Sequence, residues 1–541
     1  MSLQQSAPAA DGAAAPAQLP KLTTLDEAVR RQARLRPQAV AYEFEGRSVT
    51  YGQLAQDTSR IANGLAALGL GKGDRIAYLG KNSDVYFELL IGAARAGVVM
   101  TPVNWRLAPP EAAYVINDCA APVLFVGPEF VGLARRLLPE LAHVRTVITT
   151  EGGAPEWPDF AAWRDAQSDA APGSRPKPDD VAIQLYTSGT TGRPKGAMLT
   201  NANLLFMTQE GLGPDAPSWY AWTPDDVALL AMPCFHIGGT QWGVNTLAFG
   251  AKGVVAREFD PDRVMDYFEQ CGVTRIFMVP AAMQIVVRQP RARRADFSRL
   301  KTIFYGASPI PAALLRECID TFGCEFVQVY GMTETTGAIV ALPPEDHVEG
   351  NPRMRGAGKA MPGVELAVFD DRGEMLPPGR TGEIATRSAA NMAGYWNLPE
   401  ATAAAIRPDG WLRTGDAGYM DEDGYIYIQD RIKDMIISGG ENVYPAEVES
   451  AICDHPAVAE AAVIGVPDGK WGEAVKAVVA LRPGHEATAE ELVAFVRQRI
   501  AGYKTPKSID FVDALPRNPS GKILRRELRA PYWAGYDRQV N

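Results

Sequence analysis

The stretch Tyr186-Thr187-Ser188-Gly189-Thr190-Thr191-Gly192-Arg193-Pro194-Lys195-Gly196 carries the most information about fold and function in this chain. It follows an apolar run, residues 181–186, that predicts a β-strand. It holds three glycines, four serine or threonine hydroxyls and one lysine within eleven positions. Glycines let the backbone approach an anion, hydroxyls add donors, and the lysine supplies charge. A flexible glycine-rich hairpin would need neither the hydroxyls nor the lysine, so the segment predicts a polyphosphate-binding loop.

The loop differs from the Walker A pattern, in which G-x-x-x-x-G-K-[ST] opens a helix. Here Lys195 is followed by a glycine, and residues 197–199 favour a strand instead. Thr200 or Asn201 is then expected to cap the next helix. A P-loop hydrolase, which would release ADP and phosphate, is therefore disfavoured.

Two more segments place small and polar residues directly after a predicted strand. The strand at residues 302–305 runs into Gly306-Ala307-Ser308-Pro309, and the strand at 326–330 runs into Tyr330-Gly331-Met332-Thr333-Glu334-Thr335. Because α/β sheets bind ligands at the carboxyl ends of their strands, we expect both segments to line a ligand site. Taken alone, Glu334 would be interpreted as a solvated carboxylate.

Together these motifs give the chain a specific resemblance. From about residue 22 to 530 it resembles the adenylate-forming superfamily of acyl-CoA synthetases, peptide-synthetase adenylation domains and beetle luciferases. Residues 187–196 match the signature phosphate loop of that superfamily. Its further motifs follow in the family's order at residues 330–335, 411–416, 430–434, 438–445 and 516–523. The resemblance implies an AMP-forming acid–thiol ligase that uses ATP, Mg²⁺ and CoA.

The resemblance also implies roles for single residues. Tyr330 would stack near adenine, and Asp416 and Arg431 would bind the ribose. Thr335 would touch the α-phosphate and Glu334 the magnesium ion. The other implied contacts to nucleotide, metal or CoA are Thr187, Ser188, Gly189, Thr190 (also a metal ligand), Thr191, Gly192, Lys195, Gly306, Ala307, Ser308, Gly331, Met332, Thr333, Gly439 and Gly440.

Lys522 lies on a glycine turn near the C-terminus. A lone lysine there would usually be surface charge, but the family has its adenylation lysine at this position. Lys522 can reach the phosphates only if the C-terminal domain folds over the larger one. The second half-reaction needs no lysine at the phosphate, so the same domain could swing and present Gly439 and Gly440 to the pantetheine of CoA.

Two interpretations of His236, which precedes an apolar helix, stay open. It is either a hydrogen-bonded core histidine or, by resemblance, a catalytic-site gate between the acyl pocket and the CoA tunnel. Asn201 stands where many family members have histidine. The expected pocket positions are too mixed to decide the acid: Phe277, Met278, Gly306, Gly331, Met332 and Ala338.

A medium- or long-chain fatty acid is the preferred substrate, since residues 186–528 look most like bacterial fatty-acyl ligases. The alternatives are an aryl acid of the coumarate, ferulate or benzoate type, and an acyl-AMP ligase that serves a carrier protein. A non-catalytic nucleotide-binding homologue is disfavoured, because all five expected functional groups are present: Lys195, Glu334, Asp416, Arg431 and Lys522.

The order of helical and β-branched stretches predicts a layered α/β fold. We expect a large N-terminal AMP- and acyl-binding domain, residues 22–431, with two α/β sheets and a small β-rich subdomain. A smaller, mobile α+β lid should follow at residues 432–541, and residues 1–21 predict a disordered tail. Residues 151–180 are expected to form a connecting loop, and residues 411–416 a loop before a strand.

Composition limits the class of partner. The 541 residues are 46% hydrophobic and 22% charged, as in soluble globular proteins. A net charge of −10 disfavours nucleic-acid binding, so local donors must hold anionic ligands. The six cysteines include no C-x-x-C pair and fit a reducing cytosol.

No apolar stretch is long enough to span a membrane, and the N-terminus does not resemble a signal peptide. We therefore expect a cytoplasmic enzyme whose partners are a small carboxylic acid, ATP and CoA. Peripheral membrane contact and a homodimer stay open.

Overall fold

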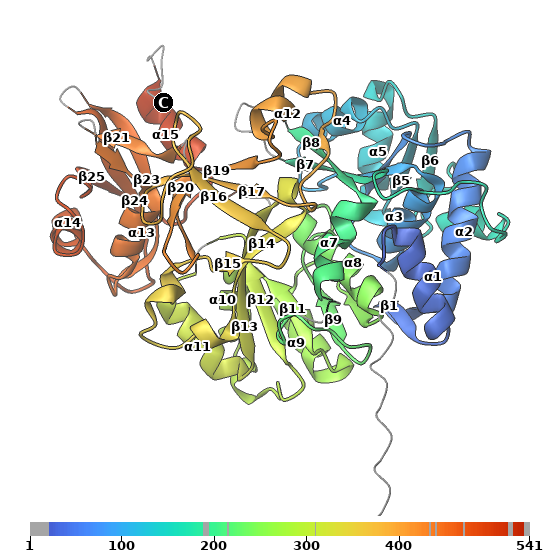
Figure 1. The fold of residues 1–541 in the computed structure, drawn as a ribbon, viewed down its shortest axis with the longest axis horizontal. Coiled ribbons are helices and arrows are strands. Elements are labelled where there is room, and N and C mark those ends of the chain that lie inside the picture. The colour runs from blue at the N-terminus through green and yellow to red at the C-terminus, as the bar shows by residue number, and fades with distance from the viewer. Residues whose placement is uncertain are drawn as a thin grey trace, which may run out of the picture.

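The computed structural model describes residues 21–187, 194–211, 213, 216–308, 310–431, 434–438, 441–468, 471–517 and 523–534. Within these ranges the strands form four sheets, of seven, nine, four and five strands (Figure 1). The expected α/β class is therefore confirmed. All of the expected tail except Lys21 lies outside the described residues.

The seven-stranded sheet carries the two strands that flank the phosphate loop. In spatial order its strands are β18 (Gly394–Tyr395), β8 (Lys195–Thr200), β7 (Val181–Thr187), β4 (Val99–Pro102), β3 (Arg75–Leu79), β5 (Val123–Val126) and β6 (Thr146–Thr149). The helices between β2 and β7 along the chain are α2 (Tyr51–Ala67), α3 (Asp84–Ala96), α4 (Pro109–Asp118), α5 (Val131–Leu137) and α6 (Phe160–Asp165). Thr50 caps α2 through a capping box with Gln53.

The nine-stranded sheet supplies the other expected ligand-binding ends. Its order is β15 (Lys359–Ala360), β14 (Gly337–Leu342), β13 (Glu325–Met332), β12 (Thr302–Gly306), β11 (Arg275–Met278), β9 (Val227–Leu230), β10 (Lys252–Val255), β1 (Val40–Phe44) and β2 (Arg47–Thr50). Helix α1 (Leu25–Leu35) precedes β1 in the chain, and the helices between β8 and β13 are α7 (Asn201–Gly211), α8 (Ile237–Phe249), α9 (Pro261–Cys271), α10 (Pro280–Val287) and α11 (Ala312–Phe322). Strands β11, β12 and β13 are parallel, so their carboxyl ends meet at one edge.

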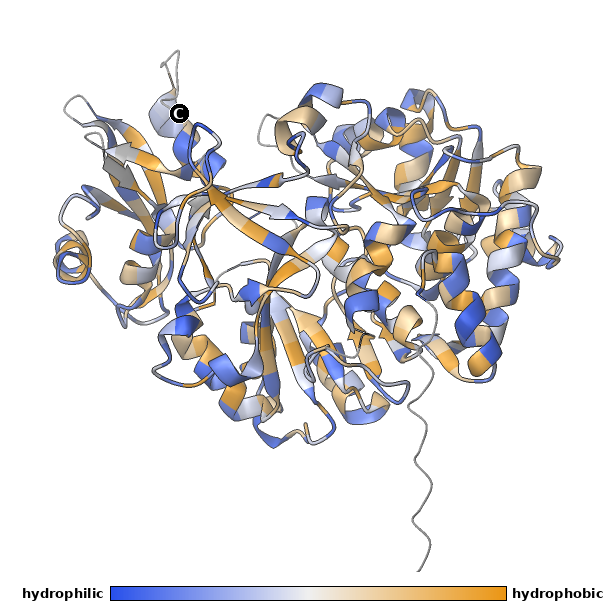
Figure 2. Ribbon diagram, in the orientation of Figure 1, coloured by the Kyte–Doolittle hydropathy of each residue, from blue (hydrophilic) through white to orange (hydrophobic). Residues whose placement is uncertain are grey.

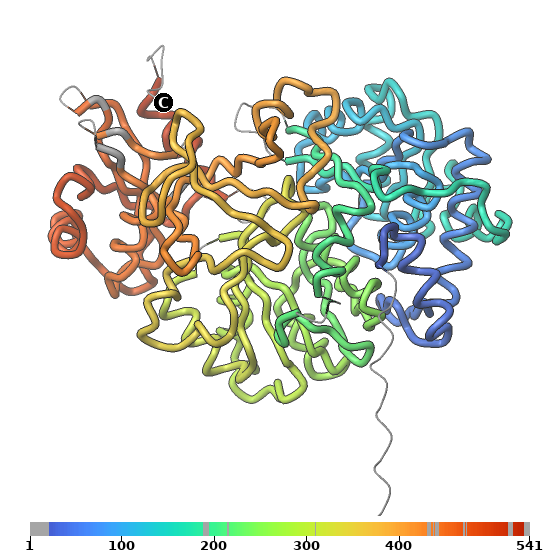
Figure 3. The backbone as a smooth tube through the Cα atoms, viewed as in Figure 1, coloured from blue at the N-terminus to red at the C-terminus, as the bar shows by residue number. Residues whose placement is uncertain are grey.

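Two smaller sheets follow along the chain. The four-stranded one joins β16 (Glu365–Phe369), β17 (Gly382–Arg387), β19 (Leu412–Met420) and β20 (Ile426–Arg431), with α12 (Pro399–Ala405) nearby in sequence. The five-stranded one contains β21 (Ile436–Ser438), β22 (Glu441–Val443), β23 (Val458–Asp468), β24 (Gly472–Leu481) and β25 (Ser508–Phe511), packed with α13 (Pro445–Cys453), α14 (Ala489–Arg497) and α15 (Arg525–Trp533). In the tube of Figure 3 this last part, orange to red, forms a lobe at one end of the molecule, opposite the blue N-terminal part.

The main core lies between the two large sheets. Helix α3 contacts β4 and β7 on one side and β1 on the other, while α7 and α8 pack together between β8 and β9. Figure 2 shows hydrophobic residues concentrated along the strands of these sheets. The C-terminal lobe has a separate core that includes Val463, Val479 and Leu492. Among the described residues, no helix has the length and apolarity that a membrane crossing requires.

Two local expectations differ from the structure. Residues 151–180 contain α6, because Asp159 caps its first turn and Phe160 is buried against Phe125 and Trp163. Residues 412–416 are part of β19 rather than a loop. The Thr-Gly-Asp sequence resembles a turn, and the register with β17 is irregular there. Arg413 and Ala417 pair with β17 on either side of it, and Asp416 pairs with β20, so the strand continues through the segment.

Candidate active site

The phosphate-loop strand and the end of β13 meet at one point. Thr187, the last residue of β7, donates its hydroxyl to Oε1 of Glu334 over 3.4 Å, across 147 positions of sequence. Glu334 lies in the short 3-10 turn Thr333–Thr335 that follows β13. The structure therefore brings together two of the motifs that the sequence singles out.

Glu334 is a buried residue, only 6% exposed, and several neighbours hydrogen-bond to it. Tyr395 donates its hydroxyl to the same oxygen, Oε1, over 2.7 Å. The backbone N–H of Met392 donates to the Glu334 carbonyl at 2.8 Å. The ammonium of Lys195 lies 5.0 Å from the centre of the Tyr395 ring. A lysine cation and a buried carboxylate thus share one aromatic neighbour.

The turn after Glu334 depends on the Thr335 hydroxyl, which is fully buried. It accepts the N–H of Met332 at 2.9 Å and lies 2.7 Å from the carbonyl oxygen of Gly337. A Cβ on Gly331 would approach that same carbonyl oxygen to 1.8 Å, so only glycine fits there. The phosphate contact expected of Thr335 stays a prediction, because here its hydroxyl serves the turn.

The expected ribose-binding residues are brought together by strand pairing. Asp416 in β19 lies directly opposite Arg431 in β20. Tyr330 donates its hydroxyl to Oδ2 of Asp416 at 2.5 Å. The N–H of Asp416 donates to the Thr414 hydroxyl at 3.1 Å. The Asp416 carboxylate is thereby fixed at the end of β13, beside the position expected for adenine.

Gly306, Ala307 and Ser308 form the exit of β12. A Cβ on Gly306 would come within 2.1 Å of the Val329 carbonyl oxygen, so the two strands approach closely there. Ala307 has a φ of 66°, in the left-handed region, and the chain turns away from the sheet at once. Ala307 and Ser308 are exposed, as the wall of a ligand site should be.

His236 occupies the N-cap position of α8 and lies half-buried, with its ring centre 4.5 Å from that of Phe235. The first turns of α8 face β14 and β11. A Cβ on Gly337 would lie 3.8 Å from both Ile237 and Gln241. Phe277, the only half-buried residue of β11, faces Gly238. Both interpretations of His236 stay open.

Half-buried polar groups support the strands that flank the phosphate loop. Tyr186 donates its hydroxyl to Asp118 at 2.5 Å, and burial raises the pKa of this phenol, so it stays protonated. Trp396 donates its indole N–H to the Asp118 carbonyl at 2.9 Å and its backbone N–H to Gly196 at 2.8 Å. Sequence reasoning missed the contacts of Tyr395 and Trp396, since only tertiary packing places them here.

Several expected site residues lie outside the described residues: Ser188, Gly189, Thr190, Thr191, Gly192, Gly439, Gly440 and Lys522. The backbone of Arg431 is described but its side chain is not. Their roles stay predictions.

The residues present suit a magnesium ion that arrives with a nucleotide. Among the described residues, no group of three histidine, cysteine or acidic side chains could hold a metal by itself. Mg²⁺ bound to a polyphosphate usually needs only one or two protein carboxylates. Glu334 offers one, and both of its hydrogen bonds within the described part of the chain reach Oε1. Oε2 is thereby the oxygen suited to a cation.

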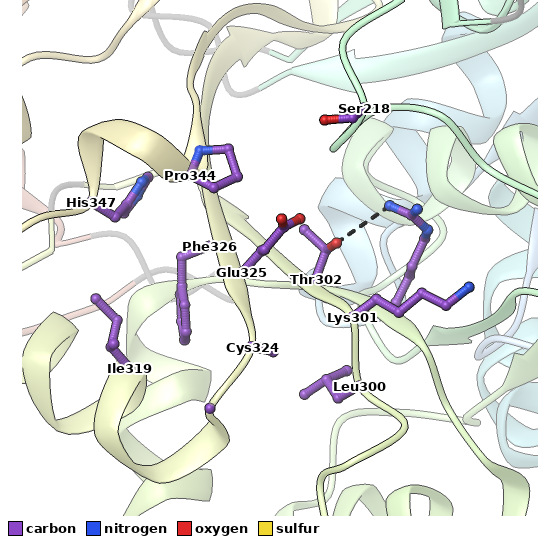
Figure 4. A pocket seen from close by; sticks show the side chains of 12 residues that line it. Ser218, Leu300, Lys301, Thr302, Ile319, Cys324, Glu325, Phe326, Pro344 and His347 are labelled. Atoms are coloured by element: carbon purple, nitrogen blue, oxygen red, sulfur yellow. Dashed lines mark hydrogen bonds between the residues drawn. The ribbon is translucent and has the colours of Figure 1, made fainter.

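A hollow of about 640 Å³ opens at the amino ends of β12 and β13, away from the candidate site (Figure 4). Its walls include Thr302 and Glu325, the first residues of β12 and β13, together with Lys301 and His347. At about 3.3 Å per residue, Thr302 lies roughly 13 Å from Gly306 along β12. The hollow is therefore distinct from the candidate site at the carboxyl ends.

Comparison with known proteins agrees with this geometry. The chain matches the family model of AMP-binding enzymes over residues 29–396 and that of the AMP-binding enzyme C-terminal domain over residues 447–522. It is 42% identical over 527 residues to a fatty acid–acyl-carrier-protein ligase of Streptomyces coeruleorubidus, covering 96% of this chain and 99% of that protein. It is 41% identical to a feruloyl-CoA synthase of Amycolatopsis, covering 92% and 97%.

The structure of ATP-bound MatB from Rhodopseudomonas palustris superposes with a TM-score of 0.83 at 33% identity, covering 93% of this chain and 99% of that one. The chain therefore belongs to the AMP-binding enzymes, and it is an ATP-dependent, adenylate-forming acid–thiol ligase.

Proposed function

We propose that the chain is an AMP-forming carboxylic acid–CoA ligase, which first makes acyl-AMP and then the CoA thioester. The observation that carries this proposal is the junction of Thr187, Glu334 and Tyr395 beside Lys195. It sets a cation and a buried carboxylate at the end of the phosphate-loop strand, where a triphosphate with its magnesium ion would need them.

The first half-reaction makes a poor acyl electrophile reactive. A carboxylate oxygen attacks the α-phosphorus of ATP, and pyrophosphate leaves. Two anions must approach each other, so cationic groups lower the barrier. Lys195 and Lys522 would supply positive charge, and Thr335 would support the α-phosphate. Mg²⁺ held by Glu334, with Thr190 as a second ligand, would neutralise phosphate charge when bound.

The second half-reaction is thiol attack on the acyl carbonyl, with AMP leaving together with the former carboxyl oxygen. Asp416 and Arg431 would keep the ribose in place, and Tyr330 the adenine. A rotation of the lid, residues 432–541, would exchange Lys522 for Gly439 and Gly440, and His236 would border the path of the thiol.

For the acid, we propose a fatty acid of medium length. The first turns of α8 lead from Gly238 to Trp242, which is only 7% exposed. Its ring centre lies 5.2 Å from that of Phe304 and 6.3 Å from that of Phe277. Such a wall would limit the depth of the pocket. A second candidate, an aryl acid, is favoured by the same aromatic rings and by the relative that is a feruloyl-CoA synthase.

A panel of acids tests this function. The purified enzyme is supplied with ATP, Mg²⁺ and straight-chain acids of increasing length or with cinnamates and benzoates. Each reaction contains either CoA or a phosphopantetheinylated carrier protein. We expect AMP and pyrophosphate in equal amounts and an acyl-CoA from a medium-length acid. ADP as the product would contradict the adenylation chemistry, and thioester on the carrier protein alone would contradict CoA as the acceptor.

A further inference from the structure

Tyr395 is tied by its backbone to the strand that leaves the phosphate loop. Strand β18 pairs antiparallel with β8, with Tyr395 opposite Ala197. Its N–H donates to the Thr402 hydroxyl at 2.9 Å. The next residue, Trp396, donates its N–H to Gly196 at 2.8 Å. These contacts fix the position from which the Tyr395 side chain extends.

The Tyr395 side chain contacts two groups of opposite charge. Its hydroxyl lies 2.7 Å from Oε1 of Glu334, and its ring centre lies 5.0 Å from the Lys195 ammonium. A hydrogen bond to a carboxylate and a cation above an aromatic ring are both favourable, and both strengthen where water is excluded. Glu334 is 6% exposed, so water has little access to replace the phenol.

We propose that Tyr395 is a positioning residue for the adenylation step. Its hydroxyl occupies Oε1 of Glu334 and so leaves Oε2 for the magnesium ion that would arrive with the nucleotide, while its ring would keep Lys195 at the phosphate loop. The assignment rests on the proposed function, because that function gives Glu334 and Lys195 their roles. Tyr395 itself need not touch the substrate, so its effect passes through its two neighbours.

The hydroxyl can be removed without the ring. Tyr395→Phe deletes the hydrogen bond to Glu334 and keeps the ring beside Lys195. Tyr395→Leu deletes both interactions. Tyr425→Phe is a matched control, since the Tyr425 hydroxyl also donates to a buried carboxylate, Oδ2 of Asp346, at 2.5 Å, and neither residue belongs to the candidate site.

The decisive readout is metal binding, measured without turnover. Mn²⁺ replaces Mg²⁺ and is titrated by electron paramagnetic resonance in the presence of α,β-methylene-ATP. We expect Tyr395→Phe to weaken Mn²⁺ binding about 10- to 100-fold, the usual cost of losing a group that orients a metal ligand. The affinity for the same analogue in EDTA should match the wild type. Tyr395→Leu should weaken analogue binding in EDTA as well, because it removes the aromatic ring beside the Lys195 ammonium.

Unchanged Mn²⁺ affinity in Tyr395→Phe would overturn the proposal, and so would an equal loss in Tyr425→Phe. If Tyr395→Phe unfolds, Thr187→Val replaces it, because Thr187 bonds to the same oxygen at the longer distance of 3.4 Å. It should weaken Mn²⁺ binding less, about severalfold, and no change would again overturn the assignment. If the wild-type enzyme binds Mn²⁺ with the analogue but catalyses no ATP–pyrophosphate exchange with any acid, the proposed function is wrong. The Tyr395 assignment is tested separately, by metal binding alone.

Discussion

The phenol oxygen of Tyr330 lies 2.5 Å from Oδ2 of Asp416, although the two residues are 86 positions apart. Tyr330 belongs to β13 of the nine-stranded sheet and Asp416 to β19 of the four-stranded sheet. The candidate nucleoside site is therefore built across two sheets, and both sheets must be in place before it exists.

Replacing Asp416 tests the ribose assignment. We expect Asp416→Ala to weaken ATP binding about 10- to 100-fold, because a hydrogen bond to a charged group contributes about 1.5–3 kcal/mol. The same substitution should weaken the binding of 2′-deoxy-ATP by a smaller factor, since that nucleotide already lacks one hydroxyl of the ribose diol. Calorimetric titration of both nucleotides measures the difference. The control is Asp423→Ala, an exposed residue paired with Arg353 at 2.9 Å, which should bind both nucleotides normally. Equal losses for ATP and 2′-deoxy-ATP would contradict the ribose role.

Trp242 should set the longest acid that the enzyme accepts. We expect Trp242→Leu to move the preferred acid to longer chains, because the smaller side chain would deepen the pocket. The measurement is kcat/KM across straight-chain acids. Trp222→Leu is the matched control: Trp222 is also 7% exposed, packs 4.8 Å from the Trp242 ring and stacks on Phe249. It should lower stability, by less than the roughly 3–5 kcal/mol typical of Trp→Ala, and leave the acid preference as it is. A preference that moves equally in both variants would argue against Trp242 as the end wall.

Local sequence patterns predicted much of this architecture. The apolar runs at residues 302–305 and 326–330 predicted strands, and the structure has β12 and β13 there. The strands on the two sides of the phosphate loop, β7 and β8, were predicted from the apolar runs at residues 181–186 and 197–199. These features depend on residues close in sequence, which is why a single sequence is enough to predict them.

Other parts depend on residues far apart in the chain. Nothing near Tyr395 indicates that its hydroxyl bonds to Glu334, 61 positions away. Asp416 was expected in a loop before a strand, and Gly415, which precedes it, has a φ of 72°. The pairing of Asp416 with β20, and of Arg413 and Ala417 with β17, still keeps the segment in β19. Tertiary pairing overrode a local turn signal there.

Asp226 should make the nine-stranded sheet sensitive to acid. This fully buried carboxylate lies just before β9 and pairs with Lys301 at 2.8 Å and with Arg275 at 3.3 Å. Burial by itself would raise the pKa of Asp226, but the hydrogen bond from Lys301 and the other donors around it lower this pKa to about 2.

An unfolded aspartate titrates near pH 4, so the charged form stabilises the fold above that pH, and this contribution is lost as the pH falls toward 2. We expect Asp226→Asn to lower the free energy of unfolding by about 2–3 kcal/mol at pH 7, and the gap to the wild type to narrow between pH 5 and pH 2. Urea unfolding across this range measures both, with the exposed neighbour Asp225→Asn as control. A gap that widens on acidification would contradict the assignment.

Lys522 should separate the two half-reactions. One charge at about 4 Å is worth roughly 4 kcal/mol at an effective dielectric near 20, so Lys522→Ala should slow acyl-AMP formation about a thousandfold. Thioester formation from supplied acyl-AMP should stay close to normal. Stopped assays of each half-reaction test this, with the exposed Arg526→Ala in α15 as the control. Equal slowing of both halves would refute the division of labour.

The most direct test of the account follows the oxygen atoms of the acid. The enzyme is supplied with an acid carrying ¹⁸O in both carboxylate positions, together with ATP, Mg²⁺ and CoA, and the products are analysed by mass spectrometry. If the carboxylate attacks the α-phosphorus, each thioester formed leaves one ¹⁸O in the phosphate of AMP and keeps the other in its carbonyl. Unlabelled AMP, or ¹⁸O in inorganic phosphate, would contradict an acyl-adenylate intermediate.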